Sequence, residues 1–422
     1  MVKLKRILMV SVLLGIGSYS CGSPEEHFKN QITEPVSLPY NSILETLKLK
    51  EDWISKTAET EIPDLPAQDE IVLQEDLGRA FIASMDGWIW KADLKRKTAE
   101  PFVKTSLLPA GMVAHPKNKD VLFFCVSRAK EGDADSENGP GIYELTISEK
   151  RIRRIGTRVP LDDGRVISKR SGIGVLYPDT VQKTLEFSKM NETNSRNVEK
   201  ADDLAISRDG ERIYFTEPYN HSKAILGVSS QSRKEVFTLG KNGRLWKYDL
   251  KNERASLVAE EYSYLDGILL EYEDGEKETA AIVNELSKSR LLRLYLRGER
   301  AGRDEIVIDG IPGFPDGMDR DSRGRIWIAL PVERSKLVTW LHEHPFWKKL
   351  LLYVPDRLFP VSKKTGIVAL SPDGTKPLFY TMYDGERFSQ IIVVVPGKDK
   401  LYLAVYQEGH KGLVALPYPP DL

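Results

Sequence analysis

Short hydrophobic strands recur along the chain in pairs. A short apolar strand comes first, and a second strand, usually of the form Gly-x-apolar-x-x-apolar, follows it. The first pair spans residues 80–83 and 87–92. Turn-forming residues such as Asp209 and Gly210 precede several of the first strands, so the pattern predicts antiparallel hairpins. Five further pairs begin at residues 121, 212, 280, 325 and 400.

The spacing of these hairpins indicates the architecture. The shortest separations are 41 and 45 residues, between the strands that begin at 80 and 121 and those that begin at 280 and 325. Such a spacing suits the four-stranded blade of a β-propeller, and the larger separations leave room for insertions. We therefore predict an all-β fold, a six-bladed β-propeller over residues 66–422. The alternative is an irregular β-sandwich that happens to contain six hairpins.

Acidic residues recur at one position in four of the six units. Counting back about ten residues from each hairpin reaches the start of the innermost strand, at the mouth of the central channel of a propeller. Carboxylates so close together require a cation or shared protons, and oxygen ligands without clustered His or Cys suit Ca²⁺. We therefore predict a calcium site, although each carboxylate taken singly is better explained as a turn cap or an arginine partner. The four residues are Glu70, Asp202, Asp266 and Asp316.

A segment rich in leucine and aromatic residues interrupts the fifth unit. Residues 332–362 include Leu337, Trp340 and Phe346, at a spacing that suits an amphipathic helix broken at Pro345. We expect a helical lid over the channel mouth, with a small-molecule substrate or ligand beneath it. A helix that rests on a membrane and a plain packing helix are the alternatives.

The N-terminal residues predict export. Within residues 1–20, three basic residues precede an apolar run over 7–16 that is too short to cross the ~30 Å hydrocarbon core of a membrane. Small residues and then Cys21 follow, which resembles the lipobox of a bacterial lipoprotein, in which the cysteine carries the lipid. We expect an exported lipoprotein at the cell envelope, at the outer membrane or the periplasmic face. A signal peptide that is simply cleaved is the alternative.

The segment after the cysteine is polar. Residues 21–65 contain several prolines and one stretch, 42–58, that can form a short helix. We interpret this segment as a lipid-anchored tether that holds the folded body off the membrane.

Charge and cysteine content exclude two classes of function. The chain has 61 Lys and Arg against 62 Asp and Glu, a formal net charge of -1, so the basic excess of a nucleic-acid-binding protein is missing. Two cysteines make neither a disulfide framework nor a cysteine-rich zinc site. Cys125 lies in an apolar strand and is expected to be a small buried hydrophobic residue.

Two histidines are candidates for the general base of a hydrolytic reaction. His221 and His410 fall on loops expected at the face of the channel mouth, and imidazole titrates near neutral pH. The alternative is that they lie on these loops by chance.

Three motifs carry a family resemblance: residues 243–250, Tyr-Leu-Asp-Gly at 264–267, and Pro-Gly-Phe-Pro-Asp-Gly at 312–317. They resemble the strictosidine synthase-like family, above all its adipocyte plasma membrane-associated protein-like branch. The resemblance spans residues 66–418. It implies kinship with paraoxonases and gluconolactonases, six-bladed propellers that commonly hold Ca²⁺ in the channel.

The resemblance also bears on the predicted ligands. Glu70 and Asp316 match acidic metal ligands of the paraoxonases, whereas Asp202 and Asp266 stand where relatives usually have asparagine. The resemblance thus implies a metal cage at the predicted place that is more acidic than in the relatives.

The catalytic residues of the relatives are not present at the matching positions. Strictosidine synthases use a glutamate in the sixth blade where this chain has Ser389, so a condensation of that type is disfavoured. Paraoxonases use a histidine pair, and the matching position in the second blade is Ala110. Our first hypothesis is a calcium-dependent hydrolase of lactones or esters, in which the metal polarises the carbonyl. The alternative is a non-catalytic propeller with structural calcium that binds a ligand or partner.

Overall fold

The computed structural model describes residues 26–422 except 49–52, 131–132, 134–137, 162–171, 228, 274, 276, 356–357, 359–360 and 421. The expected signal peptide, residues 1–20, and Cys21 lie outside the described residues.

Six antiparallel sheets form the blades of a propeller. The first two blades consist of β2 (Gln68–Gln74), β3 (Arg79–Ser84), β4 (Trp88–Asp93) and β5 (Thr98–Lys104), and of β6 (Leu108–Ala114), β7 (Val121–Ser127), β8 (Gly141–Thr146) and β9 (Arg151–Gly156). The third consists of β14 (Leu204–Ile206), β15 (Arg212–Glu217), β16 (Gly243–Asp249) and β17 (Arg254–Tyr262), and β11 (Val175–Leu176) and β12 (Thr184–Glu186) also pair with β17.

The other three blades follow the same order. The fourth consists of β18 (Leu265–Glu271), β19 (Ala280–Glu285), β20 (Arg290–Tyr295) and β21 (Asp304–Ile308), and the fifth of β22 (Met318–Arg320), β23 (Ile326–Leu330), β24 (Thr365–Leu370) and β25 (Pro377–Tyr383). The sixth consists of β26 (Ile391–Pro396), β27 (Lys400–Val405), β28 (Lys411–Pro417) and β1 (Glu59–Pro66). A separate ribbon joins β10 (Arg158–Pro160) to β13 (Ser195–Asn197).

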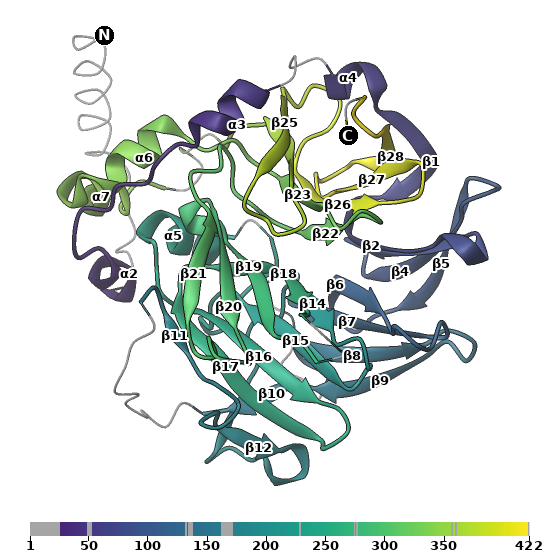
Figure 1. The fold of residues 1–422 in the computed structure, drawn as a ribbon, viewed down its shortest axis with the longest axis horizontal. Coiled ribbons are helices and arrows are strands. Elements are labelled where there is room, and N and C mark those ends of the chain that lie inside the picture. The colour runs from purple at the N-terminus through teal and green to yellow at the C-terminus, as the bar shows by residue number, and fades with distance from the viewer. Residues whose placement is uncertain are drawn as a thin grey trace.

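The six-bladed propeller expected from the hairpins is confirmed. The strands predicted over residues 80–83 and 87–92 correspond to β3 and β4, the second and third strands of the first blade, and the other hairpins occupy the same places in their blades. The first strands of the blades, β2, β6, β14, β18, β22 and β26, gather around the middle of the molecule (Figure 1).

The ring is closed by a strand that the sequence did not predict. β1 pairs antiparallel with β28, with Glu59 opposite Ala415 and Thr60 opposite Val414. The sixth blade therefore takes its outer strand from the N-terminal side of the chain, so the propeller begins at residue 59 rather than 66.

The segment before β1 also packs against the propeller, which corrects the prediction of a polar tether over residues 21–65. Three short helices lie here: α2 (Glu26–Gln31), α3 (Ser42–Leu47) and α4 (Trp53–Thr57). Each buries one apolar side chain, Phe28, Leu44 or Ile54, at 0% exposure. Because these residues have fixed places in hydrophobic clusters, the described helices of this segment are part of the folded body.

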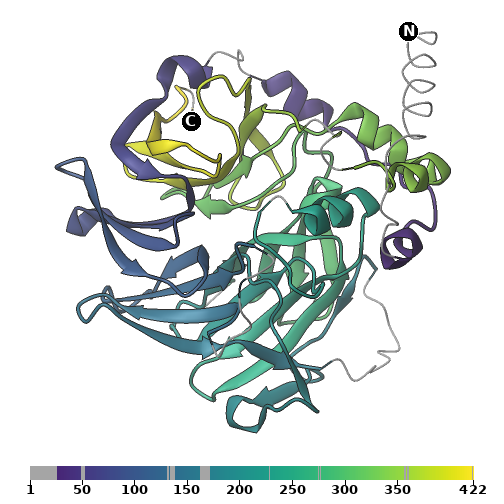
Figure 2. The same ribbon diagram turned by 180° about the vertical axis from the view of Figure 1, so that it is seen from behind.

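Two insertions add helices on one side of the ring. α5 (Ser230–Thr238) lies between β15 and β16, while α6 (Lys336–His342) and α7 (Pro345–Leu351) lie within 332–362, between β23 and β24. Ser229 and Ser335 cap α5 and α6, since each side chain accepts a hydrogen bond from a backbone amide of the first turn. α2, α6 and α7 lie together at the edge of the molecule in both views (Figures 1 and 2). None of the described helices is long and apolar enough to cross a membrane.

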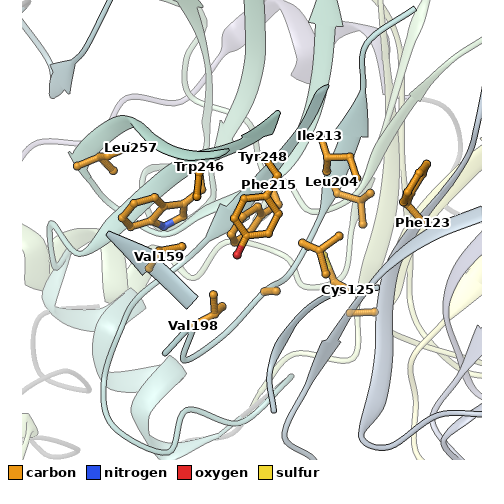
Figure 3. Packing of buried hydrophobic residues seen from close by; sticks show 14 of the residues in the cluster. Phe123, Cys125, Val159, Val198, Leu204, Ile213, Phe215, Trp246, Tyr248 and Leu257 are labelled. Atoms are coloured by element: carbon orange, nitrogen blue, oxygen red, sulfur yellow. The ribbon is translucent and has the colours of Figure 1, made fainter. Parts of the chain in front are cut away.

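Hydrophobic clusters between neighbouring blades hold the ring together. Between the second and third blades, Phe123 and Cys125 from β7 pack against Ile213, Phe215 and Tyr248 from β15 and β16 (Figure 3). Cys125 is a free thiol at 0% exposure, in agreement with its expected role as a small buried hydrophobic residue.

Candidate functional site

A cavity of about 700 Å³ lies at the axial ends of the inner strands. Its floor is acidic, and carboxylates from four different blades line it. The four predicted metal ligands, one from each of these blades, are among them, so the structure brings together residues that are almost 250 positions apart in the chain. The six acidic residues of the floor are Asp69, Glu70, Asp202, Asp203, Asp266 and Asp316.

The innermost strand pair is irregular in four of the six blades. The register of the innermost pair shifts between Gln68 and Glu70 in the first blade, and between Leu265 and Ile268 in the fourth. The second and sixth blades have shifts at the corresponding place. Such bulges bend a strand and re-aim one side chain, and two of them lie beside Glu70 and Asp266. Asp202 and Asp316 precede β14 and β22, whose pairing with the next strand is regular.

Neighbouring blades approach each other closely at this level. The amide of Gly111 donates a hydrogen bond to the carbonyl of Asp202 at 2.9 Å, and the amide of Gly317 donates to the carbonyl of Ile392 at 2.8 Å. A β-carbon on Gly111 would lie 2.7 Å from that Asp202 oxygen, so only glycine fits there. Asp202 is thus fixed by a backbone contact with the second blade, and the residue after Asp316 by one with the sixth.

The floor carboxylates destabilise one another's charge. Burial, and then repulsion from the neighbouring carboxylates, raises the pKa of Asp69 and Asp266 well above its usual range. The same causes raise the pKa of Asp203 to about 7 and that of Asp316 to about 8, although backbone amides oppose the shift. These shifts are the electrostatic signature of a group of buried like charges that a cation would stabilise.

One cation of the chain itself reaches this group. The Lys200 side chain is 1% exposed, and its Nζ lies 3.2 Å from Asp202 Oδ2. The same nitrogen donates to the Tyr264 hydroxyl at 2.9 Å and lies 5.1 Å from the centre of the Tyr219 ring. Burial by itself lowers the pKa of Lys200, but the attraction of Asp202 and Tyr264 raises it well above its usual range. Lys200 is therefore a charged counter-ion within the acidic floor.

Sequence reasoning missed both Lys200 and Asp69. The method chose one position in each blade, so the second acidic residue of the first blade was left out. The alternating pattern carried a signal for the lysine, because Lys200 and Asp202 are two residues apart and extended chain places such residues on the same side.

The donor set of the floor agrees with the chemistry of calcium. It offers carboxylate oxygens, and among the described residues the Oδ1 atom of Asn284 is buried without a hydrogen-bond partner. Asn284 also donates through its amide nitrogen to the backbone carbonyl of Asp316, which places it beside the cavity floor. Hard oxygen donors and excess negative charge suit Ca²⁺. No group of three or more Asp, Glu, His or Cys within the described ranges is already arranged around one point as a metal site. The fit is thus one of donor type and charge.

The two candidate histidines lie away from the described lining of the cavity. His221 Nε2 lies 2.9 Å from Oε2 of the buried Glu235, and its ring packs beside Phe28. His410 Nε2 lies 2.8 Å from the carbonyl oxygen of Gly412. Both imidazoles are engaged in local contacts, and the structure does not bring either one together with the acidic floor.

The position that holds a catalytic glutamate in strictosidine synthases has a structural role here. The Ser389 amide and hydroxyl both donate to Oε1 of Gln407, at 2.7 and 3.0 Å. The next residue, Gln390, lines the cavity. A hydrogen-bonded serine lacks the carboxylate of that glutamate, so the structure gives no support to the condensation.

The cavity walls are apolar, and both helical insertions contribute to them. Val236 and Phe237 come from α5, and Val338, Leu351 and Leu352 come from the 332–362 insertion. The insertion predicted as a lid therefore forms helices that line the cavity. Basic side chains, Arg233, Lys234, Arg334 and Lys336, lie among these wall residues.

The family resemblance is borne out by comparisons with curated proteins. The adipocyte plasma membrane-associated protein of Bos taurus is 25% identical over 221 residues, 50% of this chain and 50% of that protein. Strictosidine synthase-like protein 10 of Arabidopsis thaliana is 27% identical over 153 residues, 36% of this chain and 38% of that protein. The matches with these relatives thus cover half of their length or less. No family model matches the chain.

A comparison with solved structures supports the architecture. A gluconolactonase from Xanthomonas campestris aligns with a TM-score of 0.50 at 11% identity, over 95% of this chain and 99% of that one. At this identity the likeness establishes the propeller fold alone.

Proposed function

We propose that this protein is a calcium-dependent hydrolase that opens lactones or esters in the acidic cavity. The observation that carries the proposal is the convergence of six carboxylates from four blades on the floor of one cavity of about 700 Å³ with apolar walls. A site of that size holds a small organic molecule, and its floor supplies hard oxygen donors.

The predicted ligands remain the best candidates to hold the ion. Glu70, Asp202, Asp266 and Asp316 each come from a different blade and share the floor. A bound Ca²⁺ would supply a Lewis acid that polarises a carbonyl group. The buried Oδ1 of Asn284 is a neutral oxygen donor beside these carboxylates.

The rest of the reaction would depend on the chain's own groups. Phe237, Phe314 and Leu352 offer an apolar surface for the body of the substrate and exclude water from one side of the floor. Lys200 holds Asp202 in place through its ion pair, so that this carboxylate has a defined orientation. His221 and His410 remain candidate bases from the sequence, but their places in the structure make a floor carboxylate a better acceptor for the proton of the attacking water.

A non-catalytic binding propeller is the second candidate. It is favoured by the distance of both histidines from the cavity lining and by the serine at position 389. In that case the ion would neutralise the floor and the cavity would hold a ligand without turnover.

The cellular place of the reaction is also a proposal. The basic and apolar residues before Cys21 support export and lipid attachment, with the folded body held at the bacterial cell envelope. The protein would then act on small molecules outside the cytoplasm.

The test is hydrolysis of a panel of lactones and aryl esters, with and without a calcium chelator. We expect turnover that the chelator abolishes and added calcium restores. Asp266→Asn should abolish turnover, whereas Glu333→Gln, which removes a carboxylate at the cavity wall that pairs with Lys364 at 3.7 Å, should retain it. An inert wild type across the panel, with folded protein and bound calcium, would favour the binding propeller instead.

A further inference from the structure

Exposed hydrophobic side chains are concentrated on one part of the surface. Eleven large hydrophobic residues are exposed among the described residues, and six of them lie within 332–362. A seventh, Tyr40, has its hydroxyl 3.3 Å from Thr339 Oγ1 on α6. Single exposed hydrophobic residues are ordinary on soluble proteins, but a cluster of this kind marks an interaction surface. The six are Leu337, Trp340, Phe346, Leu350, Leu358 and Val361.

The two helices of the insertion are apolar on opposite faces. Their inner face lines the cavity through Val338, Leu351 and Leu352. Their outer face presents Leu337 at 61% exposure and Phe346 at 68% exposure to solvent. A helix at the surface of a water-soluble protein normally places polar residues on the side away from the core. The outer face of α6 and α7 therefore has the character of a surface that something covers.

The charged residues beside this face indicate the kind of partner that covers it. Lys336 and Lys349 are exposed on the same helices. The exposed acidic residue at the end of α6, Glu343, accepts a hydrogen bond from Ser37 Oγ at 3.0 Å and is held toward the N-terminal segment. An apolar helix face bordered by lysines is the pattern of a segment that lies in the headgroup region of an anionic membrane.

The path of the chain points to the same partner. α2 packs beside α7, because Phe28 and Ile32 share a hydrophobic cluster with Leu352. Cys21 lies five residues before the start of α2 at Glu26, so it is within about 18 Å of that helix even if the chain is fully extended. The candidate lipid attachment site is therefore joined by a short chain to the helix that packs beside α7.

We propose that the outer face of α6 and α7 docks on a lipid bilayer that contains anionic lipid. The docked face is Leu337, Trp340, Phe346 and Leu350, with Lys349 at the phosphate level and Lys336, which is exposed and also lines the cavity, at its border. Val361 is exposed and also lines the cavity, so the docked surface adjoins the cavity opening. Apolar molecules dissolved in the bilayer then reach the cavity without crossing water.

The test measures binding of the full, unlipidated chain (Cys21→Ala) to vesicles of phosphatidylethanolamine and phosphatidylglycerol. Adding the pair Leu337→Ser and Phe346→Ser should lower the partition coefficient at least about tenfold, since two exposed apolar side chains lose their contact with lipid. The matched control is the pair Leu77→Ser and Ile306→Ser, which removes similar side chains at 49% and 43% exposure from other parts of the surface. The chain with the control pair should bind the vesicles as strongly as the Cys21→Ala chain does.

A second readout locates the contact. Lipids brominated near the headgroup should quench tryptophan fluorescence. Trp347 lies 5.3 Å from the Phe346 ring, so the pair Trp340→Phe and Trp347→Phe should remove most of that quenching. Equal partitioning of the two serine pairs, or quenching that persists in the variant with both tryptophans replaced, would overturn the proposal. Self-association without vesicles would also overturn the proposal if the Leu337→Ser and Phe346→Ser pair abolished it. The face would then be covered by a second copy of the chain.

Discussion

Replacement of Lys200 by methionine tests the electrostatic description of the cavity floor. Methionine keeps much of the side-chain volume but removes the positive charge that lies 3.2 Å from Asp202 Oδ2. At that distance and an effective dielectric constant of about 20, the attraction between the two charges is about 5 kcal/mol. The two side chains are 1% and 13% exposed, so water screens the pair only weakly. Removing one partner of a buried ion pair costs about 3–5 kcal/mol.

We therefore expect Lys200→Met to lower the free energy of unfolding by about 3–5 kcal/mol in the presence of chelator. Calcium should recover more stability in the variant than in the wild type, because the variant leaves a larger uncompensated negative charge on the floor. Urea unfolding, with chelator and with calcium, measures both quantities.

Two control variants separate charge from packing. Lys200→Arg keeps the charge and should lose less stability than Lys200→Met. Lys234 lines the same cavity with its Nζ 5.5 Å from the centre of the Phe28 ring, and Lys234→Met should cost no more than about 1 kcal/mol. A loss below about 1 kcal/mol in Lys200→Met, or equal recovery by calcium in variant and wild type, would refute the reasoning.

Three further outcomes are expected. Cys21→Ala should abolish incorporation of a labelled fatty acid and release the protein from the membrane fraction to a measurable extent; unchanged labelling would exclude Cys21 as the attachment site. Burial, together with the neighbouring Lys348 and Arg334, lowers the pKa of His342 from 6.5 to about 3, so the unfolded chain takes up its proton first and stability falls as pH drops from 6.5 toward 3. Urea denaturation across this pH range should show that His342→Leu loses less unfolding free energy than the wild type; an equal loss would assign the acid sensitivity to other groups. His221→Gln should leave kcat unchanged, since its imidazole pairs with Glu235, and a large fall in kcat with intact folding would restore this histidine as the base.

The sequence was sufficient for the propeller because its hairpins are local and repeat. Strands such as β3 and β23 are apolar runs bounded by turn residues, and each pairs with the next strand along the chain. β1 was missed for the opposite reason. Its partner β28 is more than 350 residues away, and Pro63 and Pro66 are typical of loops. An edge strand tolerates prolines, since one side of it needs no partner.

The predicted tether illustrates another limit. Phe28 is an isolated apolar residue that gives no periodic signal, and Leu44 and Ile54 lie in the stretch 42–58, whose helical pattern does not tell what the helix packs against. Their burial depends on surfaces that exist only after the propeller has formed, such as the cluster that Phe28 shares with Leu352. Burial of this kind is decided by tertiary contacts rather than by local pattern.

The sequence predicted the position of the acidic floor correctly, but it did not predict all of its residues. Counting from the hairpins identified one carboxylate in each of four blades, because the blade repeat fixes the distance to the axis. Counting one acidic position in each blade passes over Lys200, whose spacing from Asp202 carried a signal but whose role arises from the neighbouring charges. Counting also cannot exclude His221, whose loop turns toward α2 and α5.

The central claim is tested most directly by titration calorimetry, which measures the binding of calcium to the full chain after treatment with chelator. We predict about one bound Ca²⁺ per chain, as expected for a single cage of oxygen ligands. Asp266→Asn should weaken binding strongly, and Glu333→Gln should bind as the wild type does. A folded wild type that releases no heat with calcium and retains no metal on dialysis would contradict the account.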